Sequence, residues 1–267
     1  CLPVDPDDAW VREFFGNLPC LPLPELRRAM NAPAVDLVRR GGKRWRPLLT
    51  VYASMLAGAG EKALSLTPLV ELPHNGSLIL DDIEDSSDFR RGEPAVHVKF
   101  GEDIAINAGC LLYFLPTALI DRFDAPDSVK LNLHRLFGER MRRLHLGQAM
   151  DITWPRDPRA VPSREQYDLM TRMKTGVLAR FSFELGLVAA GMDVERAIAL
   201  SDPLETAGVA FQILDDVKNL ETGNPGKKRG DDDVEGKRSL PFILMCEKNP
   251  YIIEENLALF LQANTNG

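Results

Sequence analysis

Hydrophobic residues recur at intervals of three and four along most of this chain. That spacing places them on one face of an α-helix, and it is clear in segments 47–59, 108–123, 129–152 and 175–191. Alternation of apolar and polar residues, which is typical of strands, is short and rare. Prolines gather between the periodic segments, as in 154–163, where they are typical of loops and helix starts. The pattern predicts an all-α fold.

The length and the apolar content predict a single domain. The chain has 267 residues and is 45 % hydrophobic, enough for a sizeable core. It shows no break in composition and no low-complexity linker, so we expect one helical bundle over residues 1–267. It contains no run of 18 or more apolar residues, so we expect no membrane span.

Charge and cysteine usage narrow the class of protein. The net charge of −7 argues against general nucleic-acid binding, but local basic groups and metal ions still permit anionic substrates. The four cysteines contain no CxxC pair, and the N-terminus lacks the basic start and apolar core of a secretion signal. We therefore expect reduced thiols in a cytoplasmic protein.

Two acidic clusters follow apolar runs, in "LILDDIED" (78–85) and "QILDDVKN" (212–219). On a helix, Asp81 and Asp85 share a face about 6 Å apart, whereas Asp82 is turned away by about 100°. Asp215 pairs in the same way with Asn219. One such cluster alone is more often a solvated face, but its repetition favours a cavity that holds magnesium ions between two helices. Calcium in an EF-hand is disfavoured because the D-x-D-x-D-G spacing is absent.

Basic residues gather in four further stretches. They are "GGKRWRP" (41–47), "FRRGEP" (89–94), "MKTG" (173–176) and "GKKRGDDDVEGKRS" (226–239). Each is more often a solvated surface alone, but beside two acidic clusters they favour a site for two polyphosphate substrates. No GxxxxGK[ST] loop and no GxGxxG after a strand supports a nucleotide site.

Six motifs in order give the chain a resemblance to a known family. They are "GGKRWRP", "LPHNGSLILDDIEDSSDFRRGEPAVH", "HLGQAMDI", "MKTG", "FQILDDVKNL" and "DDDVEGKRSLP". Together the six motifs resemble the trans-type isoprenyl diphosphate synthases, also called the polyprenyl synthetase family, and are most similar to its geranylgeranyl diphosphate synthases. The resemblance implies the isoprenoid synthase fold, an all-α bundle around a deep central cavity, in a homodimer. It also implies a magnesium-dependent prenyltransferase that joins an allylic diphosphate to isopentenyl diphosphate head to tail.

The resemblance assigns roles to residues by motif. The catalytic set comprises Asp81, Asp82, Asp85, Asp215, Lys174 and Lys228, with Asp81, Asp85 and Asp215 as metal ligands. The isopentenyl diphosphate set comprises Lys43, Arg46, His74 and Arg91. The allylic diphosphate set comprises Arg90, Lys174, Thr175, Gln212, Lys228 and Lys237, with Gln148 and Asp151 as a supporting pair.

Product length is expected to follow from the depth of the cavity. Gly76 and Ser77 lie one turn before Asp81 and are small, which would leave room for a hydrocarbon tail. Tyr113, Phe114 and His145 are bulky and would close the cavity near the twenty-carbon product, although Tyr113 and Phe114 are nearly as well explained as ordinary core. We interpret His97 as a structural histidine.

Several alternatives stay open. A farnesyl or longer-chain polyprenyl diphosphate synthase would share every motif. A terpene cyclase has one diphosphate to hold and would not need the "GGKRWRP" segment, and a non-catalytic partner subunit tends to lose the aspartates kept here. A di-iron four-helix protein lacks support because no Glu-x-x-His pairs occur. The chain ends sooner after "ILDDVKN" than the family pattern predicts, so we expect its C-terminal helices to be incomplete.

Overall fold

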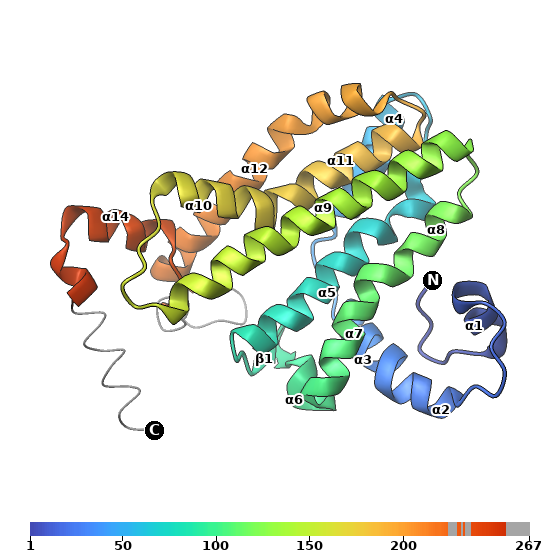
Figure 1. Cartoon of the computed structure of the whole chain (residues 1–267), viewed down its shortest axis with the longest axis horizontal. Coiled ribbons are helices and arrows are strands. Elements are labelled where there is room, and N and C mark those ends of the chain that lie inside the picture. Colours follow the sequence, from blue (N-terminus) through green and yellow to red (C-terminus); the bar gives the residue numbers. More distant parts are fainter. Residues whose placement is uncertain (224–228, 231, 233–235, 255–267) are drawn as a thin grey trace. The chain divides into compact units, whose positions relative to one another are not determined.

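The computed structural model describes residues 1–223, 229–230, 232 and 236–254 (Figure 1). Among these residues the chain is helical apart from loops and one pair of two-residue strands. The all-α prediction is confirmed. Packing divides the chain into two compact units, the first with residues 1–138 and 181–201, the second with residues 139–180 and 202–267.

The first unit is built largely from short helices and the α5–α7 pair. Its elements are α1 (Asp8–Phe15), α2 (Leu23–Leu26), η1 (Arg27–Asn31), α3 (Ala32–Arg39), α4 (Trp45–Leu56), η2 (Lys62–Leu66), α5 (Pro68–Glu84), β1 (Phe89–Arg90), β2 (Glu93–Pro94), α6 (Val96–Phe100), α7 (Glu102–Phe114), η3 (Leu115–Thr117) and α8 (Ala118–Asp121). Three long helices contribute residues to both units, namely α9 (Asp127–Thr153), α11 (Val177–Ala189) and α12 (Val194–Glu221). The remaining described elements, all in the second unit, are η4 (Trp154–Arg156), α10 (Arg164–Thr171), η5 (Arg172–Gly176) and α14 (Leu240–Lys248).

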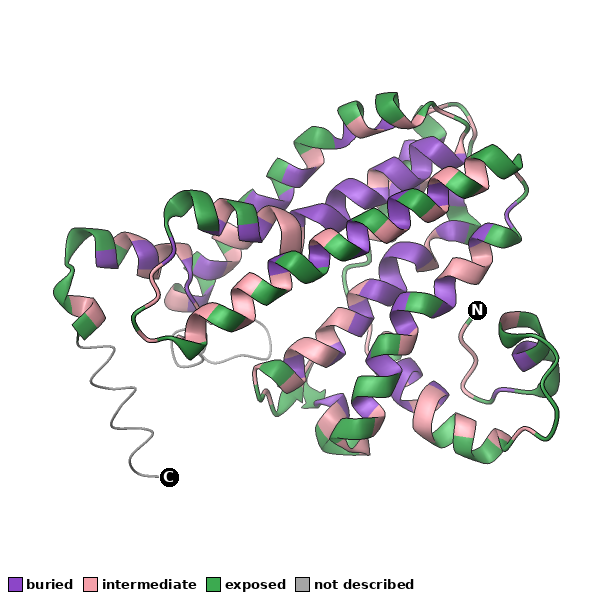
Figure 2. Ribbon diagram, viewed as in Figure 1, coloured by how far each residue is buried: buried purple, intermediate pink, exposed green. Residues whose placement is uncertain are grey.

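The core of the first unit lies where α5 and α7 run side by side (Figures 1 and 2). Ile79 of α5 and Ala108 and Leu112 of α7 are fully buried in one apolar cluster. The helices can approach this closely because Gly76 faces the backbone of α7. A Cβ atom at position 76 would lie only 2.7 Å from the carbonyl oxygen of Gly109.

The stretch Glu102–Asp121, which spans α7 to α8, is the one part of the described chain that passes a membrane-span test of length and composition. Its mean hydropathy is 1.6. The core helix of a soluble protein passes the same test, and Ala105, Ala108 and Leu112 are buried against the fold. Packing therefore accounts for the apolar residues on the inner face of this stretch, whereas Ile106 and Phe114 are exposed.

The second unit holds its own apolar cluster. Tyr167, Met170 and Ile243 are buried together, with Met150, Trp154, Ile213 and Leu240 packed around them. α10 begins with a capping box, in which Ser163 and Gln166 satisfy each other's backbone N–H groups. This cluster brings α10 and α14 together, although η5, α11 and α12 lie between them in the sequence.

Candidate active site

The end of α5 fixes the first acidic cluster. Ser86 adopts a left-handed φ of 53°, and the N–H groups of Ser87 and Ser86 donate to the carbonyls of Asp82 (2.8 Å) and Ile83 (3.2 Å). This is a Schellman motif, which stops the helix with Asp85 at its C-cap. Asp81 and Asp85 are left partly exposed on the last turn.

Asp82 differs from its two neighbours because it is fully buried. Its Oδ1 accepts hydrogen bonds from the Arg90 guanidinium, at 2.7 Å from Nε and through Nη2. Burial raises the pKa of Asp82, and the bond to Arg90 opposes that rise. Arg90, predicted to hold the allylic diphosphate, is therefore already engaged by a carboxylate in this structure. The Oδ2 atom of Asp82 is buried with no hydrogen-bond partner among the described residues.

A tight hairpin presents Arg91. β1 and β2 pair antiparallel, and the two residues between them, Arg91 and Gly92, have φ of 53° and 80° as a type I′ turn requires. Nη1 of Arg91 donates to Asn75 Oδ1 (3.2 Å) and to the carbonyl oxygens of Leu37 (3.3 Å) and Gly41. Its Nη2 lies so close to Gly42 that a Cβ there would be 3.2 Å away. The hairpin thus anchors "RRG" against "GGKRWRP".

Partly buried arginine side chains lie near His74. Burial lowers the pKa of His74 well below its ordinary value, and nearby Arg46, Arg91 and Arg90 lower it further. Burial also lowers the pKa of Arg46 to about 10, against the opposing charge of Glu71. The charge of Glu71 also acts on Arg91, and the Oε1 atom of Glu71 already accepts from Asn75 Nδ2 (3.1 Å). The Arg46 Nε is buried without a hydrogen-bond partner in the described chain.

The residues predicted to set product length fall into different environments. Ser77 hydrogen-bonds with the buried Tyr113, and burial, followed by Asp81 and Glu84, raises the Tyr113 pKa. These two predicted residues are therefore neighbours. Gly76 has a different role from the one expected, since it packs on the backbone of α7 and leaves no gap there. Phe114 is 72 % exposed and His145 is exposed too, so neither is a buried floor within one chain.

The second unit gathers the predicted allylic residues around a π-helical turn, η5. Lys174 Nζ pairs with Asp151 Oδ2 at 2.5 Å, and Thr175 Oγ1 donates to Gln212 Oε1 at 3.0 Å. Asp151 and Lys174 were assigned separately from their motifs, and the structure brings them together. Gln148 and Asp215, which are partly buried, belong to the same unit.

Glycines that the sequence analysis did not single out hold η5 in place. A Cβ at Gly147 of α9 would lie 2.5 Å from the backbone nitrogen of Lys174. A Cβ at Gly208 of α12 would lie 2.5 Å from the Cα of Gly176. Any larger residue at 147 or 208 would displace the turn, so these glycines position Lys174 and Thr175. Glycine within a helical pattern was the available signal.

Four further predicted residues are Lys43, Lys228, Lys237 and His97. Lys228 lies outside the described residues. Lys43 and Lys237 lie within the described residues. Lys43 is exposed, and Lys237 is partly buried. His97 was expected to be a satisfied structural histidine, but its Nδ1 is buried without a hydrogen-bond partner among the described residues.

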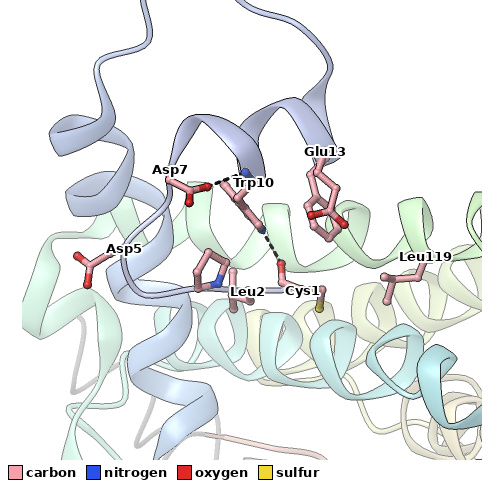
Figure 3. Close-up of a pocket in the computed structure, with 9 residues that line it drawn as sticks. Cys1, Leu2, Asp5, Asp7, Trp10, Glu13 and Leu119 are labelled. Carbon is pink, nitrogen blue, oxygen red and sulfur yellow. Dashed lines mark hydrogen bonds between the residues drawn. The ribbon is translucent and has the colours of Figure 1, made fainter.

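One pocket, of about 470 Å³, lies away from all of these residues (Figure 3). The N-terminal segment, α1 and Leu119 line it. Its carboxylates already have partners. Asp5 pairs with Arg27 (2.8 Å), Glu13 pairs with Arg122 (2.5 Å), and Asp7 accepts from the backbone N–H of Trp10 (2.7 Å). We assign this pocket no ligand.

Comparison with known proteins identifies the class. The computed structure is similar to a crystal structure of a geranylgeranyl pyrophosphate synthase (TM-score 0.79, 29 % identity, 86 % of this chain and 71 % of that one). It is also similar to a polyprenyl synthase from Caulobacter crescentus complexed with calcium and isoprenyl diphosphate (TM-score 0.73, 32 % identity, 84 % and 67 % covered). The fold is the all-α isoprenoid synthase fold.

The sequence comparison names the family. The polyprenyl synthetase profile matches residues 27–265, and this chain belongs to that family. It is 34 % identical over 247 residues to a geranylgeranyl pyrophosphate synthase of Gibberella zeae, and 37 % identical over 217 residues to one of Clitopilus passeckerianus. These matches cover 91 % and 78 % of this chain, but 64 % and 61 % of the relatives. The chain thus spans less than two thirds of their length.

Proposed function

We propose that this protein is a prenyltransferase that condenses an allylic diphosphate with isopentenyl diphosphate, head to tail, and releases geranylgeranyl diphosphate. The observation that carries the proposal is the pair of partly buried guanidinium groups of Arg46 and Arg91, whose positive charges lie near the neutral His74. Among the described residues, the buried Nε of Arg46 has no hydrogen-bond partner, and the carboxylate of Glu71, whose charge acts on Arg46, already accepts from Asn75. Uncompensated positive charge in a buried site favours an anionic ligand, and a diphosphate has matching geometry.

The acidic cluster suits divalent metal ions. Magnesium prefers hard oxygen ligands and commonly binds through one or two carboxylates with water and substrate phosphate. Asp81 and Asp85 offer such a pair on one turn of α5, and Asp215 offers a third carboxylate on α12. In the described part of the chain, no three His, Cys, Asp or Glu side chains converge by themselves on one metal position. Carboxylates that do not converge by themselves suit ions whose remaining ligands come from water and substrate phosphate. The polyprenyl synthase from Caulobacter crescentus, which is complexed with calcium and isoprenyl diphosphate, supports the use of a divalent ion.

The chemistry follows from where the charges lie. The bond between C1 of the allylic substrate and its diphosphate oxygen breaks, and the electron pair leaves with the diphosphate. Lys174, Lys237 and the second-unit hydroxyl and amide groups of Thr175 and Gln212 bind that leaving group, and bound magnesium would supply further charge stabilisation. The isopentenyl double bond, held through Lys43, Arg46, His74 and Arg91, forms the new carbon–carbon bond. The proton lost afterwards passes to the released diphosphate.

The twenty-carbon product and a homodimer are parts of this proposal. The named relatives from Gibberella and Clitopilus are geranylgeranyl pyrophosphate synthases, which supports the product. Ser77 and Tyr113 would border the substrate tail, because they lie beside Asp81. The homodimer is supported by an exposed apolar stripe on α7, formed by Ile106, Cys110 and Phe114. A cytoplasmic location is supported by the four cysteines, which are free thiols.

The test is a product assay. The purified protein is incubated with magnesium, isopentenyl diphosphate and, in turn, dimethylallyl, geranyl or farnesyl diphosphate, and the products are sized by chromatography. We expect geranylgeranyl diphosphate from at least one starter. Cyclic hydrocarbons from a single diphosphate would establish a cyclase instead. No turnover with any starter, with diphosphate binding retained, would establish a non-catalytic subunit.

A further inference from the structure

Asp216, the second aspartate of "ILDD", is only 5 % exposed and is surrounded by donors. Its Oδ2 accepts from Tyr167 Oη (2.7 Å) and from the backbone N–H of Leu240 (3.0 Å). Its Oδ1 accepts from Gln212 Nε2 (3.0 Å). An ionised carboxylate only accepts, and three donors already occupy both oxygens. Asp216 therefore has a structural environment quite unlike that of partly exposed Asp215.

Gln212 connects Asp216 with the candidate allylic site. Because Asp216 accepts, the Gln212 side chain must turn its NH₂ group toward it. The Gln212 carbonyl oxygen then faces Thr175, whose hydroxyl donates to it at 3.0 Å. Asp216 thus fixes the orientation of Gln212, and through it the hydroxyl of Thr175 in η5.

Leu240 connects Asp216 with the segment that contains Lys237. Leu240 is the first residue of α14, and its N–H is one of the groups that a helix start leaves without an intrahelical partner. Two residues earlier, the buried Arg238 donates to the carbonyl oxygens of Ala160 (2.8 Å) and Asp157 (3.1 Å). Lys237 therefore comes directly before two fixed points of the chain. The first is Arg238, with its bonds to the loop carbonyls, and the second is Leu240, with its bond to Asp216.

We propose that Asp216 is a positioning residue that fastens the Lys237–Leu240 segment to α12, and so holds Lys237, Gln212 and Thr175 in one diphosphate-binding arrangement. Asp216 is not a metal ligand. Tyr167 supports it from α10. All of these groups belong to the second unit. The inference rests on the proposed function for its kinetic consequences, but the local fastening itself does not depend on that function.

The first experiment measures the fastening without substrate. Amide hydrogen exchange of peptides covering residues 236–248 is compared by mass spectrometry in wild type, Asp216→Ala, Tyr167→Phe and Glu221→Gln. Glu221 is an exposed carboxylate on the same helix and serves as the control. We expect exchange at the start of α14 to rise at least tenfold in Asp216→Ala, less in Tyr167→Phe and not in Glu221→Gln. Unchanged exchange in both of the first two variants would overturn the proposal, whether or not the protein is an enzyme.

The second experiment separates positioning from metal binding. The KM for farnesyl diphosphate, the KM for isopentenyl diphosphate and the magnesium concentration for half-maximal rate are measured for Tyr167→Phe and Asp216→Asn, with Asp215→Asn as the metal comparison. We expect a several-fold rise in the allylic KM alone, with the magnesium dependence unchanged. A shift in magnesium dependence equal to that of Asp215→Asn would overturn the positioning role. An inactive wild type with the expected exchange pattern would instead count against the proposed function only.

Discussion

At the scale of single residues, the two aspartates of each Asp-Asp pair lie in different environments because of helix geometry. Successive residues on a helix are turned by about 100°, so one carboxylate of a pair can face a site while the next enters the protein. Asp82 and Asp216 are the buried members, and each is bound by protein donors, Arg90 in one case and Tyr167, Gln212 and Leu240 in the other. Asp81 and Asp215 stay partly exposed. The sequence could predict this rotation but not the partners, which come from distant segments.

The two substrate groups should respond separately to mutation. Arg46→Ala removes a buried guanidinium beside His74, whereas Lys174→Ala removes the ammonium that pairs with Asp151. Loss of a charge-assisted hydrogen bond costs about 1.5–3 kcal/mol, or roughly 10- to 150-fold in binding. We expect Arg46→Ala to raise mainly the KM for isopentenyl diphosphate and Lys174→Ala mainly that for the allylic substrate. Steady-state kinetics with each substrate varied in turn measures this, and equal effects on both would contradict the division.

His74 should make the protein sensitive to acid. Because burial lowers its pKa, the folded protein holds it neutral, while the unfolded chain takes up a proton below about pH 6.5. The unfolded state then binds more protons, so stability falls as the pH drops from about 7 toward the folded pKa. The free energy of unfolding is measured with urea at pH 7.5, 6.5 and 5.5. As the pH drops, it should fall by up to about 1.4 kcal/mol less per pH unit in His74→Gln than in wild type. Parallel stability curves for both proteins would exclude this role for His74.

At the scale of elements, the α5–α7 contact depends on the absence of side chains. Gly76 is unusual within a helix, and the sequence alone favours the interpretation that it leaves room for a substrate tail. The structure instead places it against the carbonyl oxygen of Gly109. Local periodicity shows which face of a helix is apolar, but not which helix covers that face. The same limit hid Gly147 and Gly208, which hold η5 through backbone contacts with residues far along the chain.

Gly76→Ala tests this packing. Alanine favours the helix by about 1 kcal/mol, but overpacking a close contact costs about 1–3 kcal/mol. Its Cβ would meet the Gly109 oxygen at 2.7 Å, which is backbone and cannot rotate away. We expect a lower melting temperature. Asn107→Ala, an exposed change on α7, should leave it unchanged or slightly higher. A Gly76→Ala protein as stable as wild type would show that the helices separate without cost.

Product length should depend on the other contact between these helices, Ser77 with Tyr113. If the substrate tail passes this turn, Ser77→Phe fills its path, and farnesyl diphosphate should become the main product. Tyr113→Ala should admit longer products, whereas truncation of ordinary core would cost about 3–5 kcal/mol and leave the products unchanged. Product chromatography together with a thermal melt of both variants separates these outcomes. If Ser77→Phe forms the same products at normal rates, the substrate tail does not pass this position.

At the scale of the whole molecule, α7 has two apolar faces. Ala105, Ala108 and Leu112 enter the core, while Ile106, Cys110 and Phe114, spaced by four, form an exposed stripe. Helical periodicity predicted the inner face. The outer stripe could not be distinguished from core in the sequence, and for this reason Phe114 was a candidate for the cavity floor. An exposed apolar stripe of this kind typically marks an interface.

The proposed homodimer predicts that a second copy covers this stripe. Ile106 is 42 % exposed and is the first residue of the stripe, so Ile106→Asp would place a charge in the buried interface. We expect the wild type to elute as a dimer, and Ile106→Asp as a monomer with an unchanged far-ultraviolet circular dichroism spectrum. Size-exclusion chromatography with light scattering measures the mass. Met245→Asp places the same charge at an exposed apolar position of α14 and should stay dimeric. A monomeric wild type, or a dimeric Ile106→Asp, would show that α7 does not form the interface.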